Sequence, residues 1–132
     1  MGLDNIWKTP TGEHPALSIR VCGGLFSGPG PETCTSFRGK VYADFIEALS
    51  GVSLYEESIT GPRIEQILTG LVEFKNMIDN TSPGYRRLAF AVEKLKGVPQ
   101  NYLEENIIEL DDLIAMFSAY AEIDGAELVS WY

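Results

Sequence analysis

The sequence predicts an α+β fold in which three or four helices pack on a small, mainly antiparallel sheet. Two observations support this prediction. Apolar residues recur at helical spacing in several segments, whereas short segments at both ends of the chain alternate apolar and polar residues as strands do. No stretch with the composition of a linker divides the 132 residues, so we expect a single domain over residues 1–132.

Both ends of the chain are expected to contribute strands to the same sheet. Residues 3–8 (LDNIWK) end at a turn cluster, and residues 127–132 (ELVSWY) alternate and end in aromatic side chains. Residues 16–22 (ALSIRVC) alternate in part and predict a further strand, and residues 52–55 predict another short one. We expect the two terminal strands to pair with each other.

Four segments place apolar residues on one helical face. The first covers residues 41–49 and ends at a Ser-Gly pair, as helices with a glycine C-cap do. The second opens at Thr-Gly-Pro and runs from residue 61 to residue 78, and the third covers about residues 84–96. Residues 101–123 have the most regular spacing. They form either one helix or two, with Asp111 capping the second.

Residues 22–42 (CGGLFSGPGPETCTSFRGKVY) connect a predicted strand to a predicted helix through a loop rich in glycine and proline. Backbone N–H groups in such a connection can converge on an anion. Ser36 or Thr35 is the expected N-cap of the helix. Arg38 and Lys40 then fall in its first turn, which is the unfavourable end for cations in the field of the helix dipole. An anion bound there would explain this placement.

We therefore expect non-catalytic binding of a phosphate-bearing small molecule or nucleotide by residues 23–40. Arginine holds phosphate through two parallel hydrogen bonds, lysine acts as a point charge, and aromatic rings stack on bases. The alternative is a structural loop whose cations pair with the protein's own carboxylates. The loop matches neither the Walker pattern nor G-x-G-x-x-G. The expected ligand-binding residues are Arg20, Ser27, Ser36, Phe37, Arg38, Lys40 and Tyr42.

The formal charge of −9 is unevenly distributed. Residues 1–96 carry ten basic and eleven acidic side chains, a sum of −1, whereas residues 97–132 carry eight acidic and no basic side chains, a sum of −8. Such a surface repels a nucleic acid duplex. It can attract a basic protein surface, or it can serve only to keep a helix face solvated. The residues expected to contact a partner are Glu104, Glu105, Glu109, Asp111 and Asp112.

The alternative function is therefore an acidic protein–protein inhibitor or immunity-type protein that acts through residues 104–127. We do not expect an enzyme, a cofactor or a metal ion. His14 is the only histidine, and with Cys22 and Cys34 it makes a small set of ligands for zinc. The segment around Ser27 lacks the glycines of a nucleophile elbow.

We expect a cytoplasmic protein with two reduced thiols. No run approaches the roughly 18 apolar residues that a membrane span needs. The first 14 residues contain no basic region followed by an apolar stretch, so we expect no secretory signal.

Four segments resemble small uncharacterised proteins of phage and prokaryotic genomes. They are the opening MGLD followed by Trp7, the segment CGGLFSG at residues 22–28, SFRGKVY at residues 36–42, and VSWY at residues 129–132. The resemblance carries no activity or site with it. It implies an accessory role in a phage or mobile element, where small acidic proteins block a host defence by binding a defence protein or by sequestering a nucleotide signal.

Overall fold

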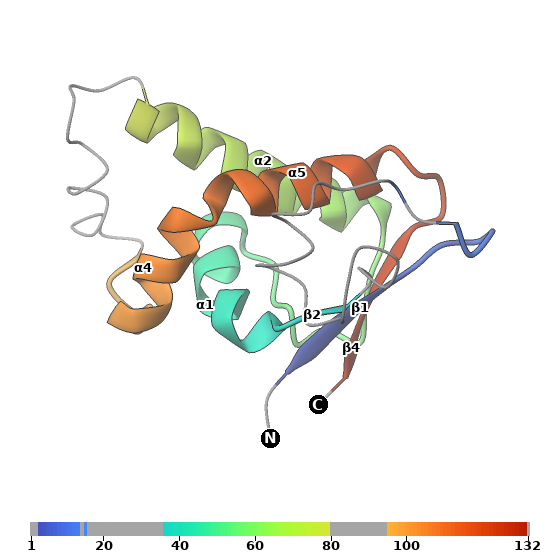
Figure 1. Ribbon diagram of the computed structural model, residues 1–132, viewed down its shortest axis with the longest axis horizontal. Helices are drawn as coiled ribbons and strands as arrows, with labels where there is room; N and C mark the ends of the chain where they lie inside the picture. Colours follow the sequence, from blue (N-terminus) through green and yellow to red (C-terminus); the bar gives the residue numbers. More distant parts are fainter. Residues whose placement is uncertain (1–2, 14, 16–35, 80–94, 132) are drawn as a thin grey trace.

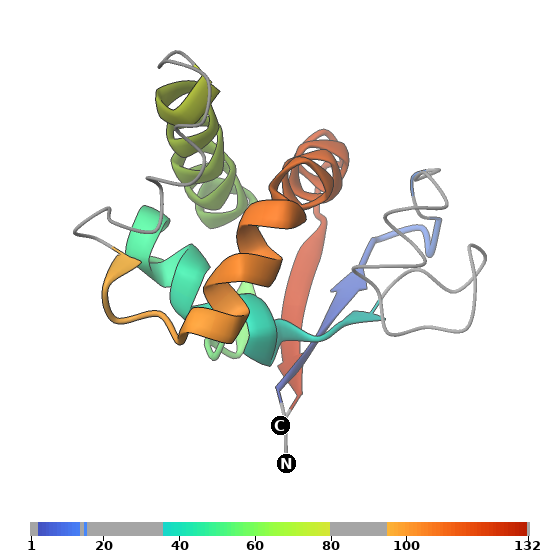
Figure 2. The ribbon, with the colours of Figure 1, turned by 60° about the vertical axis from the view of Figure 1, so that its left-hand side comes forward.

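A computed structural model describes residues 3–13, 15, 36–79 and 95–131. Within these ranges a four-stranded antiparallel sheet packs against four helices, so the predicted α+β fold is confirmed (Figure 1). The helices lie on one side of the sheet (Figure 2). The strands, in the spatial order β2-β1-β4-β3, are β1 (Asp4–Lys8), β2 (Ser36–Phe37), β3 (Ser58–Ile59) and β4 (Glu127–Trp131).

The two terminal strands form the centre of the sheet, as predicted. They pair along their whole length, from Asp4 opposite Trp131 to Lys8 opposite Glu127. Because strand side chains alternate between faces, Trp7 and Leu128 both point to the helical side and are buried. The short strands β2 and β3 each add only two residues at the edges of the sheet.

The strand expected at residues 52–55 is not formed, and the pairing segment begins later, at Ser58. Ser53 explains the difference. Its side-chain Oγ accepts a hydrogen bond from the N–H of Tyr55 at 3.1 Å, and its carbonyl oxygen accepts one from the N–H of Glu56 at 3.2 Å. These local bonds form a turn that competes with strand pairing.

The helices in the described ranges are α1 (Gly39–Ser50), α2 (Gly61–Asp79), α4 (Gln100–Ile108) and α5 (Leu110–Ala121). The C-cap of α1 is Gly51, as predicted, and its positive φ of 79° is readily adopted only by glycine. None of these helices combines the length and the apolar character needed to cross a membrane.

The segment at residues 101–123 forms two helices, α4 and α5, and not one. The break falls at Glu109, whose φ of −94° and ψ of 10° depart from helical values, and Glu109 rather than Asp111 is the N-cap of α5. Expecting Asp111 at the cap was therefore wrong. The break allows α4 to pack on α1 while α5 packs on α2.

The core between the sheet and α5 is aromatic. The ring of Trp7 stacks on Tyr120 at a centroid distance of 4.0 Å and meets Phe117 edge-on at 5.5 Å. Phe117 also meets Phe37 edge-on at 6.4 Å. Such aromatic pairs add to the stabilisation from burying their area. This packing fixes the central strand β1 and the edge strand β2 against the same helix.

Several predicted features lie outside the described residues. They are the strand at residues 16–22, most of the glycine-rich loop, nearly all of the helix predicted at residues 84–96, and both cysteines.

Candidate functional site

The predicted cations lie at the start of α1. Arg38 is the N-cap residue, Lys40 lies in the first turn, and no side chain caps the helix. Ser36 does not take the expected capping role because it pairs with Ile6 as part of β2. The backbone of the N-terminal segment replaces part of the missing cap, since the N–H of Lys40 donates to the carbonyl oxygen of Leu3 at 3.2 Å.

A buried asparagine from β1 also faces the start of α1. Asn5 has no exposed surface, and its Nδ2 donates to the carbonyl oxygen of Leu54 at 2.9 Å. Its Oδ1 lies 1.7 Å from the position that a Cβ on Gly39 would take, so only glycine permits this approach. Partial negative charge is favourable at a helix N-terminus. Oxygen atoms of Leu3 and Asn5 therefore already occupy part of the space where an anion was expected.

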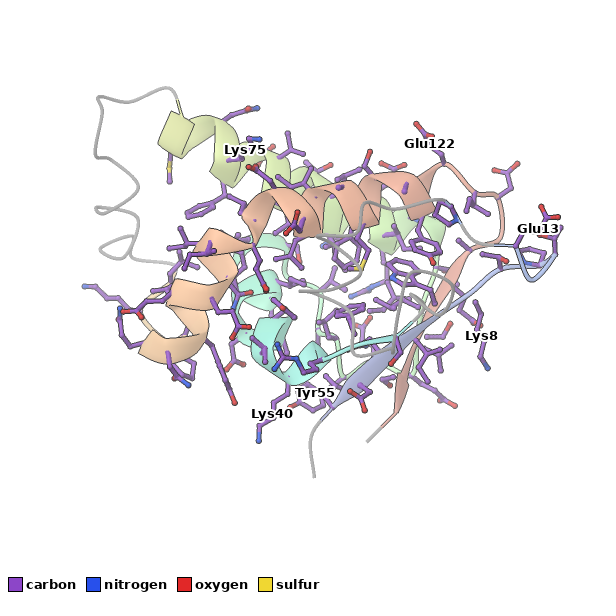
Figure 3. All side chains as sticks on the ribbon, in the orientation of Figure 1. Lys8, Glu13, Lys40, Tyr55, Lys75 and Glu122 are labelled. Atoms are coloured by element: carbon purple, nitrogen blue, oxygen red, sulfur yellow. The ribbon has the colours of Figure 1, made fainter. Side chains whose placement is uncertain are left out.

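Arg38 makes an ion pair with a carboxylate of the protein itself. Its guanidinium lies 3.1 Å from Oε1 of Glu105 on α4, and both side chains are partly exposed. This contact matches the alternative considered for the loop cations. Lys40 differs, because its side chain is exposed and points away from the molecule in Figure 3.

The two aromatic residues expected to stack on a base are fully buried. Phe37 packs between Phe117 and Tyr42, with a centroid distance of 6.2 Å to the Tyr42 ring. Neither ring offers a face to solvent, so the stacking role expected for Phe37 and Tyr42 does not agree with their burial. Arg20 and Ser27, the other expected ligand residues, lie outside the described part of the chain.

Tyr42 instead joins α1 to the acidic region. Its hydroxyl donates a hydrogen bond to the carboxylate of Glu109, at the junction of α4 and α5. Burial, together with this bond, raises the pKa of Tyr42, so that its hydroxyl stays protonated. The pKa of Glu109 is also raised, and burial is the largest cause. The charges of Glu105 and Asp112 raise it further, while the Tyr42 hydrogen bond and Arg38 lower it.

Most of the expected acidic contact residues are engaged within the protein. Glu105 and Glu109 contact α1 as described, and Asp112 is buried. Asp111 is exposed, and its carboxylate lies 2.6 Å from Nζ of Lys75 on α2. Glu104 is exposed and accepts only a long hydrogen bond of 3.4 Å from Gln100 among the contacts of the described residues.

Ile108 is a surface residue that the sequence analysis did not single out. It is 68% exposed, more than Tyr55 at 44% or Met77 at 39%, which are the other large exposed hydrophobic residues in the described ranges. Glu104 lies one helical turn before it on the same face, and Asp111 follows three residues later. The sequence did contain a sign that Ile108 is exposed. Ile108 does not belong to the helical apolar spacing formed by Leu103, Ile107 and Leu110.

A second asparagine, Asn106, was also missed. It is fully buried, and its Nδ2 donates to the carbonyl oxygen of Val41 at 2.8 Å and to that of Tyr102 at 2.5 Å. A polar residue on the inner face of an amphipathic helix was the available signal. Asn106 holds α4 against α1 beside the Arg38–Glu105 pair.

Among the described residues, no group of three or more histidine, cysteine, aspartate or glutamate side chains is placed to hold a metal ion. No protein-family model, curated protein or solved structure matches this chain.

Proposed function

We propose that this protein is a non-catalytic binding protein that recognises a basic protein surface. The contact region is formed by Glu104, Ile108 and Asp111, and we call it the corner surface because it lies where α4 meets α5. The observation that carries the proposal is the exposure of Ile108, 68%, with a carboxylate on either side in the sequence. An apolar centre with a charged rim is the common anatomy of a protein interface.

The two parts of the corner surface have different roles in binding. Burying an isoleucine side chain contributes about 1.5–3 kcal/mol, so Ile108 supplies affinity when it enters an apolar pocket on the partner. The carboxylates mainly supply orientation and a faster encounter with a basic surface. Three other acidic residues of this region, Glu105, Glu109 and Asp112, face the protein and do not contact the partner directly. They act on it through the electrostatic field of residues 97–132, whose formal charge is −8.

The resemblance to small phage and prokaryotic proteins supports placing this activity in a phage or mobile element. In that setting the protein acts as an inhibitor or immunity-type protein that binds a host protein in the cytoplasm. The absence of any basic residue after Lys96 supports the choice of a basic partner.

Capture of partners from a host lysate by the tagged protein tests the proposal. We expect Ile108→Ala and Glu104→Lys each to weaken capture of the same protein at least about tenfold, a loss that corresponds to about 1.4 kcal/mol. The matched controls are Tyr55→Ala, which removes an exposed ring elsewhere, and Glu122→Lys, which makes the same charge change at the far end of α5.

Equal capture by the wild-type protein and both corner variants would refute the proposal. An equal loss in the Glu122→Lys control would also refute it, because binding would then follow total charge rather than the corner surface.

A second candidate function is sequestration of a phosphate-bearing small molecule or nucleotide signal by residues 23–40. The observation that favours it is the exposed Lys40 in the first turn of a helix that no side chain caps. Arg20, Ser27 and Ser36 would complete such a site. Arg38 would have to exchange Glu105 for the ligand, which costs little because an exposed ion pair contributes only about 0–1 kcal/mol.

A thermal-shift screen with mono-, di- and cyclic nucleotides tests this second candidate. A ligand at about 100 times its Kd stabilises the folded state by about 2.7 kcal/mol. We expect Lys40→Ala and Arg38→Ala to remove the shift and Lys8→Ala, an exposed lysine on β1, to preserve it. A shift that survives both substitutions would exclude this site.

A further inference from the structure

We propose that Lys75 is an internal competitor at the corner surface, which a partner must displace from Asp111, and that the group that displaces it is an arginine. This inference rests on the proposed binding function and names the kind of side chain that the surface recognises. It starts from a contact between α2 and α5 in the first turn of α5.

Lys75 places a positive charge beside the corner surface. Its Nζ lies 2.6 Å from Oδ1 of Asp111, which is one of the two carboxylates of that surface. Ile108, the apolar centre of the surface, lies three residues before Asp111 in the sequence. A partner that covers Ile108 and Asp111 therefore also meets the ammonium group of Lys75.

The two carboxylates of the corner surface differ in what they already hold. Glu104 is exposed and accepts only a bond of 3.4 Å from Gln100 among the contacts of the described residues. Asp111 already holds an ammonium group, although its side chain remains 56% exposed. A cation of the partner can reach both carboxylates, but at Asp111 it competes with Lys75.

Replacing Lys75 by another cation costs little. Both side chains of the pair are partly exposed, and an exposed ion pair changes an equilibrium by no more than about fivefold. The released ammonium group is strongly hydrated, and its flexible four-carbon stem can turn it toward water. The contact with Asp111 is therefore one that a partner can exchange.

The competition decides which cation gains at Asp111. A lysine of the partner would replace one ammonium group by another, so the contacts at the carboxylate would not increase. An arginine holds a carboxylate through two parallel hydrogen bonds, so it adds a contact that Lys75 does not make. The corner surface therefore favours a partner with an arginine beside the apolar pocket that receives Ile108.

An NMR titration with a tri-arginine peptide, acetylated and amidated at its ends, tests the proposal at the backbone amides of residues 104–113. Lys75→Met keeps most of the aliphatic stem and should bind the peptide about two- to fivefold more tightly than the wild type. Lys75→Arg keeps the charge but holds Asp111 more firmly, so it should bind the peptide more weakly than the wild type. The matched tri-lysine peptide should bind the wild type more weakly than tri-arginine does.

Two controls separate competition at Asp111 from a change in total charge. Lys8→Met removes the same charge from β1, far from Lys75 in Figure 3, and should leave the affinity close to that of the wild type. In an Asp111→Asn background, the gain from Lys75→Met should fall to that of Lys8→Met, so the two substitutions should be non-additive.

Equal affinities for the wild type, Lys75→Met and Lys75→Arg would overturn the proposal. It would also be overturned by an equal gain in Lys8→Met, or by the absence of any shift at Asp111 in all these proteins. Equal binding of the two peptides would overturn the preference for arginine.

Repeating the lysate capture with Lys75→Met distinguishes this inference from the proposed function. Capture that depends on Ile108 but is the same in Lys75→Met overturns only the role of Lys75. Capture that does not depend on Ile108 overturns the proposed function itself.

Discussion

Substituting Gly39 by alanine should destabilise the protein because the new methyl group would collide with Asn5. The Cβ would lie 1.7 Å from Oδ1 of Asn5 and 3.1 Å from Cδ2 of Leu3. Asn5 would have to move and release its 2.9 Å hydrogen bond to the carbonyl oxygen of Leu54. Leaving a buried polar group unsatisfied costs about 1–3 kcal/mol, and overpacking costs about another 1–3 kcal/mol.

The higher helix propensity of alanine offsets about 1 kcal/mol of this cost. The unfolding free energy should therefore fall by about 3 kcal/mol, within a range of about 1–5 kcal/mol, as measured by urea denaturation followed by circular dichroism. The matched control is Gly61→Ala. Gly61 is the first residue of α2 as Gly39 is of α1, and nothing lies within 4 Å of its added Cβ.

The same substitution in an Asn5→Ala background identifies the cause. With the carboxamide removed, Gly39→Ala should cost close to nothing, so the two substitutions should be strongly non-additive. If Gly39→Ala is as harmless as Gly61→Ala, or if its cost is unchanged in the Asn5→Ala background, the described contact between β1 and α1 is wrong.

Three other predictions concern packing and pH. Gly70→Ala should lower the urea midpoint, at a cost of about 1–3 kcal/mol, because its Cβ would lie 2.7 Å from the carbonyl oxygen of Leu49. Trp7→Ala should cost about 3–5 kcal/mol in the same assay, because it removes the ring stacked on Tyr120. Glu109→Gln should gain stability relative to the wild type as the pH rises above 4.5, because the raised pKa makes ionisation of Glu109 unfavourable in the folded state. Urea unfolding over a pH series measures this gain, and an unchanged difference across the series would contradict it.

The sequence allowed the main elements to be predicted where periodicity is strong. The terminal strands alternate, and the apolar spacing of α1, α2 and the α4–α5 segment follows the helical repeat. These patterns are visible in the sequence because they follow from the regular geometry of a strand or a helix, which repeats from one residue to the next. The C-cap at Gly51 was predictable for the same reason, since one residue type is favoured at a left-handed position.

The residue roles at the site that were predicted wrongly depend on contacts between segments that are distant in the sequence. Ser36 is a good N-cap by residue type, but pairing with Ile6 draws it into the sheet. Nothing in the local sequence shows that Arg38 will meet Glu105, 67 residues away. Tyr42 was expected to bind a ligand, but its ring is buried and its hydroxyl donates to Glu109, 67 residues away.

The central pairing of β1 with β4 has a consequence for synthesis of the chain. The strand at residues 4–8 has its main partner at residues 127–131, so it must wait during translation until almost all the described residues have left the ribosome. Closing so large a loop is slow, and contacts of this sequence separation slow folding. Until then β1 has only the two-residue strand β2 as a possible partner in the sheet, and the side chain of Trp7 lacks the rings of α5 that cover it in the folded protein. The segment around β1 is thus most exposed to aggregation or capture by chaperones until residues 127–131 have emerged.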